Sequence, residues 1–381
     1  MTIAGKCLWA VLLAFMLLLH ASGAAAATLT LHHPATVLIE RIKIKQPLTF
    51  CGEPVPIDDP DVRERLEREM LISLDNTDSI LLWLKRANRY FPHIEQVLKS
   101  YGLPDDLKYI AIAESSLRPQ AASGKGAVGY WQFIEATGTK YGLTINNDID
   151  ERRNIFTSTE AAVQYLADLY ALFGSWSLAA AAYNMGEDGL QGEILVQKVK
   201  DYYRLHLYEE TQRYVFRILA AKIIMSNPDR FGYVLSREDL YDQRTFDVVE
   251  VSVDQAVPLT VAAQAANTYF KAIKDLNPQL RGYTLPPGTH RIYVPKGSAE
   301  DFNKRFDALL LAWTRQKDQF VYTVKKGDTL TAIAARFNVP LRAIYLWNNI
   351  SNGGRISPGN KLYLFSDDFP SQAAKEAAAA P

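Results

Sequence analysis

The segment AIAESSLRPQ (111–120) places one acidic residue, Glu114, in surroundings that predict a buried helix. Glu114 shares a helical face with Leu107 and Ile110, and most of the remaining helix is also apolar. A helix that is apolar on nearly every side belongs to a core. Burial and the negative end of the helix dipole both disfavour a charged carboxylate, so we expect Glu114 to hold a proton near neutral pH. Such a group is suited to general acid catalysis.

An ion pair with Arg118 on the next turn is a second role for Glu114, and position alone does not decide between the two. The helix is predicted to start at Pro104, which follows Gly102 and precedes two aspartates. Proline fits the first helical turn, and acidic residues there complement the helix dipole. Pro119 must end the helix, because the residue before a proline avoids the helical conformation. Glu114 therefore falls in the last turn.

Three later segments could bring further side chains beside this acid. ASGKGAVGYWQF (122–133) is rich in glycine but lacks the lysine spacing of a phosphate loop, which predicts close backbone approach to another kind of ligand. Tyr130 and Trp131 could pack on a sugar ring, although core packing is the commoner role for each aromatic. AAAAYNMG (179–186) ends an alanine-rich helix, and EETQRYV (209–215) opens another.

Taken in order, these motifs resemble those of lytic transglycosylases, the goose-lysozyme-like enzymes that cleave peptidoglycan. The GxWQF form and a tail that carries repeats are most similar to the membrane-bound murein transglycosylase D group. The matching residues are ES (114–115), Ser123, GYWQF (129–133), AYN (182–184) and ETQRYV (210–215). The pattern departs at Tyr130 and Trp131, where many relatives have Leu-Met, and this departure bears on the sugar contacts.

The resemblance implies an enzyme that breaks the β-1,4 bond between N-acetylmuramic acid and N-acetylglucosamine without water and leaves 1,6-anhydro ends. Glu114 would be the catalytic residue, first as acid and then as base. No metal or other cofactor is implied. The residues that the resemblance assigns to substrate binding are Ser115, Ser123, Gln132, Tyr183, Asn184, Glu210 and Tyr214.

Two other classes of function remain open. A hydrolytic muramidase would cut the same bond with water, and Glu210 would then be its second carboxylate. A non-catalytic peptidoglycan-binding protein would only hold the glycan, but such a protein gains nothing from a buried acid. Glu210 and Tyr214, one turn apart, could also be no more than a solvated helix start.

The C-terminal half contains an internal repeat. LTVAAQAANTYFKAIKDLN (259–277) and LTAIAARFNVPLRAIYLWN (330–348) align without a gap. An alternating strand precedes each copy, and a Pro-Gly turn and a short strand follow it, which predicts two β-α-α-β units. The helix expected at 299–318 would connect them.

The second copy resembles a LysM peptidoglycan-binding module. Asp328 or Thr329 could simply cap the helix that follows, and such a role is compatible with glycan binding. The first copy has AVP (256–258) where the second has GDT (327–329), so we expect it to pack as a spacer. The glycan-binding residues implied for the second copy are Gly327, Asp328, Thr329, Asn349 and Ile350.

The expected fold class is α+β multidomain, with an all-α lysozyme-like catalytic domain followed by two small β-α-α-β LysM-type modules. Before the catalytic domain, IERIKIK (39–45) predicts an edge strand, and a helix that buries Val62, Leu66 and Met70 is predicted after Pro60. The expected segments are a signal peptide (1–27), an N-terminal extension (28–78), a catalytic domain (79–235), a degenerate LysM-like repeat (246–297), a helical linker (298–319), a LysM domain (320–366) and a disordered tail (367–381).

The N-terminus predicts the compartment. Lys6, an apolar run at 8–19 and small residues at 21–27 are typical of a secretory signal peptide cut after Ala27, with an uncleaved anchor as the alternative. Secretion across the inner membrane implies the periplasm or cell envelope. Cys7 precedes the apolar run, so it is not predicted to carry a lipid, and tethering to a membrane stays open.

The overall composition limits the classes of partner and ligand that we expect. The chain has 381 residues with 42 basic and 42 acidic side chains, so its net charge gives no attraction for nucleic acid. Its 6 histidines show no metal-ligand spacing. Cys51, the one cysteine after Ala27, is expected to be a small buried apolar residue. Peptidoglycan strands are the expected partner, association with cell-wall machinery stays open, and nothing indicates an obligate oligomer.

Overall fold

The computed structural model describes residues 34–44, 47–317, 320–348, 350 and 353–365. The chain divides into two compact units, Met1–Lys43 and Ile44–Pro381. The predicted signal peptide and C-terminal tail lie outside the described residues. None of the helices in the described part of the chain combines the length and apolarity that a membrane span requires.

The first unit contains helix α2 (Pro34–Ile42), so the strand predicted at 39–45 is wrong. Alternation every second residue needs a neighbouring strand to pair with. The same segment also satisfies helical spacing, because Leu38 and Ile42 are one turn apart and Ile42 is buried. Glu40 of the helix forms an ion pair with Lys43, the residue after its end.

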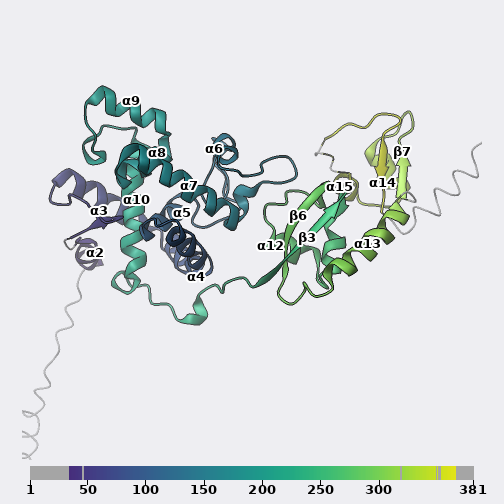
Figure 1. Cartoon of the computed structure of the whole chain (residues 1–381), viewed down its shortest axis with the longest axis horizontal. Helices are drawn as coiled ribbons and strands as arrows, with labels where there is room; N and C mark the ends of the chain where they lie inside the picture. The colour runs from purple at the N-terminus through teal and green to yellow at the C-terminus, as the bar shows by residue number, and fades with distance from the viewer. Residues whose placement is uncertain (1–33, 45–46, 318–319, 349, 351–352, 366–381) are drawn as a thin grey trace, which may run out of the picture. The chain divides into compact units, whose positions relative to one another are not determined.

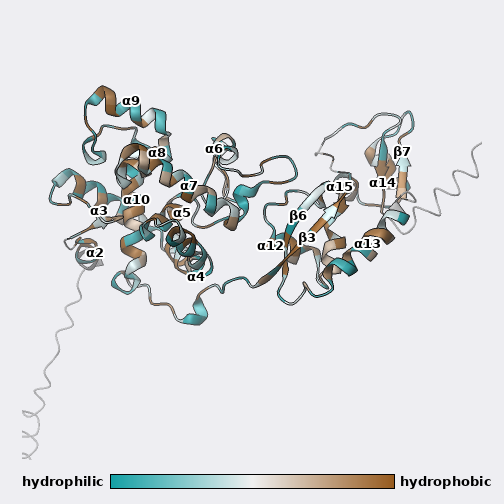
Figure 2. Ribbon diagram, viewed as in Figure 1, coloured by the Kyte–Doolittle hydropathy of each residue, from teal (hydrophilic) through white to brown (hydrophobic). Residues whose placement is uncertain are grey.

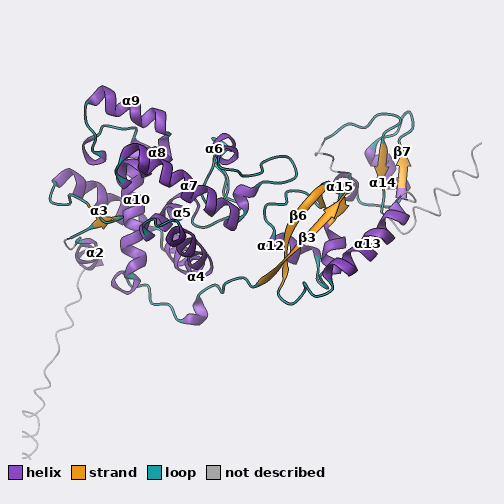
Figure 3. Ribbon diagram, in the orientation of Figure 1, coloured by secondary structure: helices purple, strands orange, loops and turns teal. Residues whose placement is uncertain are grey.

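The second unit begins with a short hairpin and a helical region. The hairpin is β1 (Thr49–Phe50) with β2 (Glu53–Pro54). Figure 3 shows how completely helices dominate the part that follows. Its helices and 3-10 turns are α3 (Pro60–Asp75), α4 (Thr77–Ser100), η1 (Asp105–Leu107), α5 (Lys108–Ser115), α6 (Glu135–Lys140), η2 (Glu151–Arg153), α7 (Ile155–Phe173), α8 (Trp176–Met185), α9 (Glu187–Gln197), η3 (Tyr202–Arg204), α10 (Glu209–Ser226), η4 (Pro228–Phe231) and η5 (Arg237–Asp239).

Helix α10 is central to this region, because it packs against α3, α5 and α8 (Figure 1). α3 starts at Pro60 and buries Val62, Leu66 and Met70, as its sequence predicts. The side chains of Ala179–Ala182 on α8 are fully buried, and small residues let neighbouring helices approach closely. The buried Glu69 of α3 accepts a hydrogen bond from Arg213 Nε of α10 at 2.6 Å, which ties these two helices together.

The two predicted β-α-α-β units are both formed, and the fold class is as the sequence indicates. In the first, β3 pairs with β6 and β4 with β5; in the second, β7 pairs with β8, all antiparallel. β3 carries many of the brown, apolar residues of Figure 2. The elements of the first β-α-α-β unit are β3 (Phe246–Val253), β4 (Val257–Pro258), α11 (Leu259–Ala265), α12 (Phe270–Leu276), β5 (Thr284–Leu285), β6 (Gly288–Pro295) and α13 (Phe302–Lys317). Those of the second are β7 (Val321–Thr323), α14 (Leu330–Arg336), α15 (Leu341–Trp347) and β8 (Lys361–Tyr363).

Equivalent asparagines show that the repeat is structural as well as sequential. Asn277 donates to Tyr293 O at 2.7 Å and accepts from Tyr293 N at 2.8 Å. Asn348, its counterpart in the second β-α-α-β unit, makes the same two hydrogen bonds with Tyr363, at 2.9 and 2.6 Å. Each asparagine therefore joins the end of the second helix to the last strand.

Helix α13, expected only as a connection, also completes the first β-α-α-β unit. Phe302 and Phe306 lie in the same apolar core as the buried valines of β3, and Trp313 packs against it. We therefore use "first repeat" for β3 to α13 and "second repeat" for β7 to β8.

Candidate active site

Glu114 lies in the last turn of α5, as its sequence predicts. The helix ends at Ser116, which has a left-handed backbone with φ of 53°, before Pro119 is reached. The Glu114 side chain is half-buried and accepts a short hydrogen bond from the Tyr214 hydroxyl of α10. Arg118 does not pair with it, since the Arg118 Nε donates to the backbone oxygen of Ser115 at 3.0 Å.

The surroundings of Glu114 favour its protonated form. Burial raises the pKa of this carboxyl to about 7, against a smaller opposing effect of the Tyr214 hydrogen bond and the Arg217 charge. The nearby charge of Glu210 raises the pKa slightly further. Glu114 can therefore give up a proton and take one back near neutral pH, which is the property that a general acid–base needs.

Ser115 of α5 supports the loop that follows this helix. It is buried, and its Oγ donates to the backbone oxygen of Tyr130 at 2.7 Å. Residues 116–134, which we call the active-site loop, thus lean directly on the helix that carries Glu114. The contacts of Ser115 are with protein atoms, so its assignment to substrate binding stays a prediction.

The aromatic pair of the active-site loop belongs to the core. Tyr130 and Trp131 are buried, and the Trp131 Nε1 donates to Thr159 Oγ1 at 3.0 Å. Tyr130 packs edge-on against Tyr90 with ring centroids 5.1 Å apart. Core packing, the commoner role for each ring, is thus what the structure shows, and the alternative of a sugar platform is not, because both side chains are buried.

The polar residues of the same loop are more accessible. Ser123 is exposed, and its Oγ accepts from the amide of Ala127 at 3.1 Å. Gln132 has a left-handed backbone with φ of 50°, and its Nε2 donates to Gly129 O at 2.9 Å. These bonds hold the two side chains in fixed places on the loop, whereas their contacts with substrate stay predictions.

Helix α8 contributes the residues of the AYN motif. The Tyr183 hydroxyl donates to the backbone oxygen of Trp131 at 2.7 Å. Burial, and then the charge of Glu114, raise the pKa of Tyr183, so this phenol stays protonated beside the acid. Asn184 Oδ1 accepts from Thr211 Oγ1 of α10 at 2.8 Å, which fixes its orientation. The structure thus brings Glu114, Tyr183 and Tyr214 together from three helices.

Glu210 differs from Glu114 in exposure and in partner. Its side chain is 61% exposed and forms an ion pair with Arg217. Arg217 was not among the predicted residues, although it stands one turn after Tyr214 on the same helix. Its charge lowers the pKa of Glu114, so it belongs to the electrostatics of the site.

Among the residues described by the structure, no group of three or more His, Cys, Asp or Glu side chains could hold a metal ion. Cys51 is a half-buried free cysteine in the turn between β1 and β2. Burial, and then the charge of Asp106, raise the pKa of its thiol, so it stays protonated. A neutral thiol of this kind is a poor nucleophile and a poor metal ligand.

The turn before α14 in the second repeat holds the other predicted residues. Gly327 has φ of 89°, a backbone conformation that favours glycine. Thr329 caps α14, since its side chain accepts from Ala332 N at 3.1 Å, as the structural alternative predicted. Ile350 packs against the core of the repeat, and Asn349 lies outside the described residues. Glycan binding by this turn stays a prediction.

Three protein-family models match the chain. The Transglycosylase SLT domain matches residues 92–204, the "Lytic transglycosylase MltD, LysM-like domain" matches residues 247–310, and the LysM domain matches residues 322–365. They follow one another in the order that the motifs predicted.

The membrane-bound lytic murein transglycosylase D of Escherichia coli K12 is 31% identical over 329 residues, which cover 83% of this chain and 72% of the relative. The protein of the same name from Escherichia coli O6:H1 matches equally. A solved structure, an inactive mutant of lytic transglycosylase Slt from Pseudomonas aeruginosa, is 19% identical. Its match covers 40% of this chain and 26% of that chain, with a TM-score of 0.29.

The matched length and identity decide the family. The motifs that resemble those of lytic transglycosylases, Glu114 among them, fall within or beside the matched SLT domain, and both repeats match LysM-type models. The chain is therefore a peptidoglycan lytic transglycosylase and belongs to the family of membrane-bound lytic murein transglycosylase D.

Proposed function

We propose that this enzyme cleaves the MurNAc–GlcNAc β-1,4 bond without water, with Glu114 as the only acid–base group. The observation that carries the proposal is the environment of Glu114, a carboxyl with a pKa near 7 that receives one phenol hydrogen bond. A hydrolytic glycosidase usually needs two carboxylates that flank the bond. Glu210, the other candidate, is exposed and paired with Arg217, which suits a lone-acid mechanism.

The proposed reaction has two proton transfers. Protonated Glu114 gives its proton to the glycosidic oxygen while the bond from that oxygen to C1 of the muramoyl sugar breaks. The 2-acetamido group of the same sugar stabilises the cationic C1. Glu114, now a carboxylate, takes the proton of the C6 hydroxyl, and the C6 oxygen bonds to C1 to close a 1,6-anhydro ring. Water enters at no step.

The other site residues receive proposed binding roles. Ser123 would hydrogen-bond the muramoyl ring or its N-acetyl group. Gln132, Tyr183 and Asn184 would hold the sugars, with Tyr183 near the charge that develops in the transition state. Glu210, Tyr214 and Ser115 would complete the wall of the binding site.

Mass analysis of the products tests the proposal. Purified peptidoglycan is digested in water enriched in heavy oxygen, and the new muramic ends are weighed. We expect anhydro ends that are one water lighter than reducing ends and carry no heavy oxygen. Reducing ends that carry heavy oxygen would instead establish a hydrolytic muramidase.

We also propose that the second repeat holds the enzyme on glycan strands through its Gly327–Asp328–Thr329 turn, and that the enzyme works in the cell envelope. The match to a LysM domain and the secretory N-terminus support this. Removing residues 320–381 should weaken sedimentation with insoluble peptidoglycan and leave cleavage of short soluble glycans nearly unchanged. Unchanged sedimentation would exclude this repeat as the anchor.

A further inference from the structure

We propose that the first repeat is a positioning module for the active site rather than a spacer. It docks on residues 146–150, a turn of the helical region from α3 to α10 that we call the catalytic region, and Asp150 and Arg152 link that turn to the active-site loop. The inference rests on the proposed function, because it assigns positioning residues to that reaction.

Main-chain hydrogen bonds join the two parts. The amide of Asp150 donates to Gln279 O at 2.8 Å, and the amide of Arg281 donates to Asp148 O at 2.8 Å. The Arg281 side chain adds a bond from Nη1 to Asn146 O at 3.0 Å. This is a short antiparallel β-bridge, centred on Ile149 and its partner residue 280.

Apolar contacts surround the bridge. Ile149 packs against the core of the first repeat, to which the buried Leu280 belongs. Phe156 of α7 meets Phe246 and Tyr293, with ring centroids 5.2 Å away in each case. The docking therefore combines directional bonds with a half-buried aromatic cluster.

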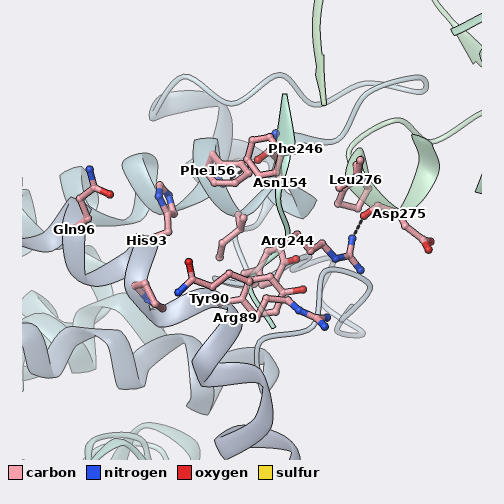
Figure 4. Close-up of a pocket in the computed structure, with 15 residues that line it drawn as sticks. Arg89, Tyr90, His93, Gln96, Asn154, Phe156, Arg244, Phe246, Asp275 and Leu276 are labelled. Atoms are coloured by element: carbon pink, nitrogen blue, oxygen red, sulfur yellow. Dashed lines mark hydrogen bonds between the residues drawn. The ribbon is translucent and has the colours of Figure 1, made fainter. Parts of the chain in front are cut away.

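A pocket of about 310 Å³ lies beside this contact. Its lining includes His93 of α4, Phe156 of α7, and Phe246 and Leu276 of the first repeat (Figure 4). Tyr130 of the active-site loop also lines it. The active-site loop and the docked repeat thus face the same pocket.

Asp150 and Arg152 carry the link onward. The Asp150 carboxylate accepts from Arg152 at both oxygens, Nε to Oδ1 at 2.8 Å and Nη2 to Oδ2 at 3.0 Å. Both side chains are buried, with exposures of 2% and 7%. The Arg152 Nη1 then donates to Gly126 O at 3.0 Å and to Phe133 O at 3.1 Å. One guanidinium thereby fixes two points of the active-site loop.

The loop also lies directly on the backbone of Arg152. A Cβ atom added at Gly129 would be 1.8 Å from Arg152 O, and Gly129 has φ of 85°. Arg153 holds the beginning of the loop, because its Nη1 donates to Pro119 O at 3.3 Å. The loop therefore cannot keep its place if the 146–153 segment moves.

The active-site loop in turn positions the catalytic neighbourhood. It carries Gln132, and its Tyr130 and Trp131 carbonyls accept from Ser115 and Tyr183. A misplacement of about 1 Å can cost about 100-fold in rate, even when it originates far from the chemistry. Docking of the first repeat therefore bears on turnover through the loop.

The internal repeat explains why the first copy is available for this role. Asn277 aligns with Asn348, so Pro278 and Gln279 align with Asn349 and Ile350, the loop predicted to bind glycan in the second copy. In the first copy this segment faces the catalytic region instead, through the Gln279 carbonyl. One edge of the module serves two different contacts.

The test compares two substitutions in the full chain. Ile149→Asp places a charge in the docking contact, and Leu311→Asp places the same charge on α13, where the leucine is 52% exposed. We expect Ile149→Asp to lower kcat on soluble glycan about tenfold with KM nearly unchanged, and the control to stay within about twofold of wild type. Amide exchange in residues 122–133 should rise in Ile149→Asp alone.

A double-mutant cycle with Arg152→Lys separates positioning from general destabilisation. If Asp150 and Arg152 carry the effect, Ile149→Asp should cost much less kcat in the Arg152→Lys background than in wild type. Equal kcat for Ile149→Asp and Leu311→Asp, or strictly additive losses, would overturn the proposal. Should Ile149→Asp fail to fold, Arg281→Ala, which removes one exposed side-chain bond, takes its place with the same criteria.

Wild-type product analysis keeps the two proposals apart. If the wild-type enzyme forms no anhydro ends, the proposed function fails whatever the variants do. If it forms them and the docking variants match the control in kcat and amide exchange, only the positioning role fails.

Discussion

Glu114 in the catalytic region and Asp328 in the second repeat are both motif carboxylates, yet their surroundings differ. Among the described residues, Tyr214 is the one hydrogen-bond donor to Glu114. Asp328 accepts from the Tyr322 hydroxyl at 2.6 Å and the Lys325 amide at 2.7 Å, and it pairs with Arg336 at 3.4 Å.

The two environments shift the pKa values of the two carboxyl groups in opposite directions. Burial raises the pKa of Glu114 to about 7. Burial also acts to raise the pKa of Asp328, but the bonds from Tyr322 and Lys325 and the Arg336 charge together lower it. Glu114, the proposed acid, receives one hydrogen bond, whereas Asp328 receives two hydrogen bonds and an ion pair. The donors around the two carboxyls therefore account for the opposite directions of their pKa shifts, because burial acts to raise the pKa of both.

The largest effect that this comparison predicts is on Glu114. Glu114→Gln keeps the shape and the acceptor for Tyr214 but cannot exchange a proton, so cleavage should fall by about 10²–10⁴-fold or more. Glu209→Gln, an exposed change nearby, is the matched control and should leave the rate nearly intact. Cleavage by Glu114→Gln within a few-fold of wild type would remove Glu114 from the mechanism.

The second prediction concerns pH. In the proposed mechanism cleavage needs protonated Glu114, whose pKa is about 7, so the rate on soluble glycan should fall about tenfold per pH unit above that value. The free energy of unfolding should also fall as pH rises. A raised folded-state pKa means that stability is lost as pH rises from about 4.5 to about 7, by at most about 3 kcal/mol.

Thermal unfolding checks the stability part of this prediction. Glu114→Gln should raise the melting temperature at pH 8 relative to wild type and have little effect at pH 5. A variant that melts lower at pH 8 would show that the ionised carboxylate is well accommodated.

A smaller effect is expected from Tyr214→Phe. The Tyr214 hydroxyl lowers the pKa of Glu114 by donating to its carboxylate, so its removal should shift the high-pH limb of the cleavage profile upward. A hydrogen bond to a charged group contributes about 1.5–3 kcal/mol, which corresponds to about one to two pH units. A limb that stays in place, or moves to lower pH, would contradict this account.

The smallest effect concerns Asp328. Asp328→Asn should destabilise the second repeat by about 1 kcal/mol, because the donors from Tyr322 and Lys325 lose a charged partner. Since the folded-state pKa is lowered, this contribution is present above the unfolded pKa and is lost as pH falls through the folded value. Amide exchange in the repeat should rise at pH 7, while cleavage of short soluble glycans stays unchanged. A change in kcat would mean that this turn also affects cleavage, beyond its structural and proposed binding roles.

Helix ends and apolar faces were readable from the sequence, because they depend on residues a few positions apart. Pro119 and the apolar face of its helix predicted Glu114 in a last turn, and the structure agrees. The aligned asparagines predicted a repeat, and both make the same bonds. The strand at 39–45 failed because alternation alone does not provide a pairing partner.

Long-range packing decided the rest. The sequence alone determined the order of motifs, the acid on its helix and the two β-α-α-β units, since local spacing fixes which residues share a face. Only the tertiary structure turned Tyr130 and Trp131 inward, brought Arg217 into the electrostatics of Glu114 and set Ile149 against the first repeat. Some of those contacts join residues more than 100 positions apart in the sequence. The periodicity within one segment does not indicate which distant segment will pack against it.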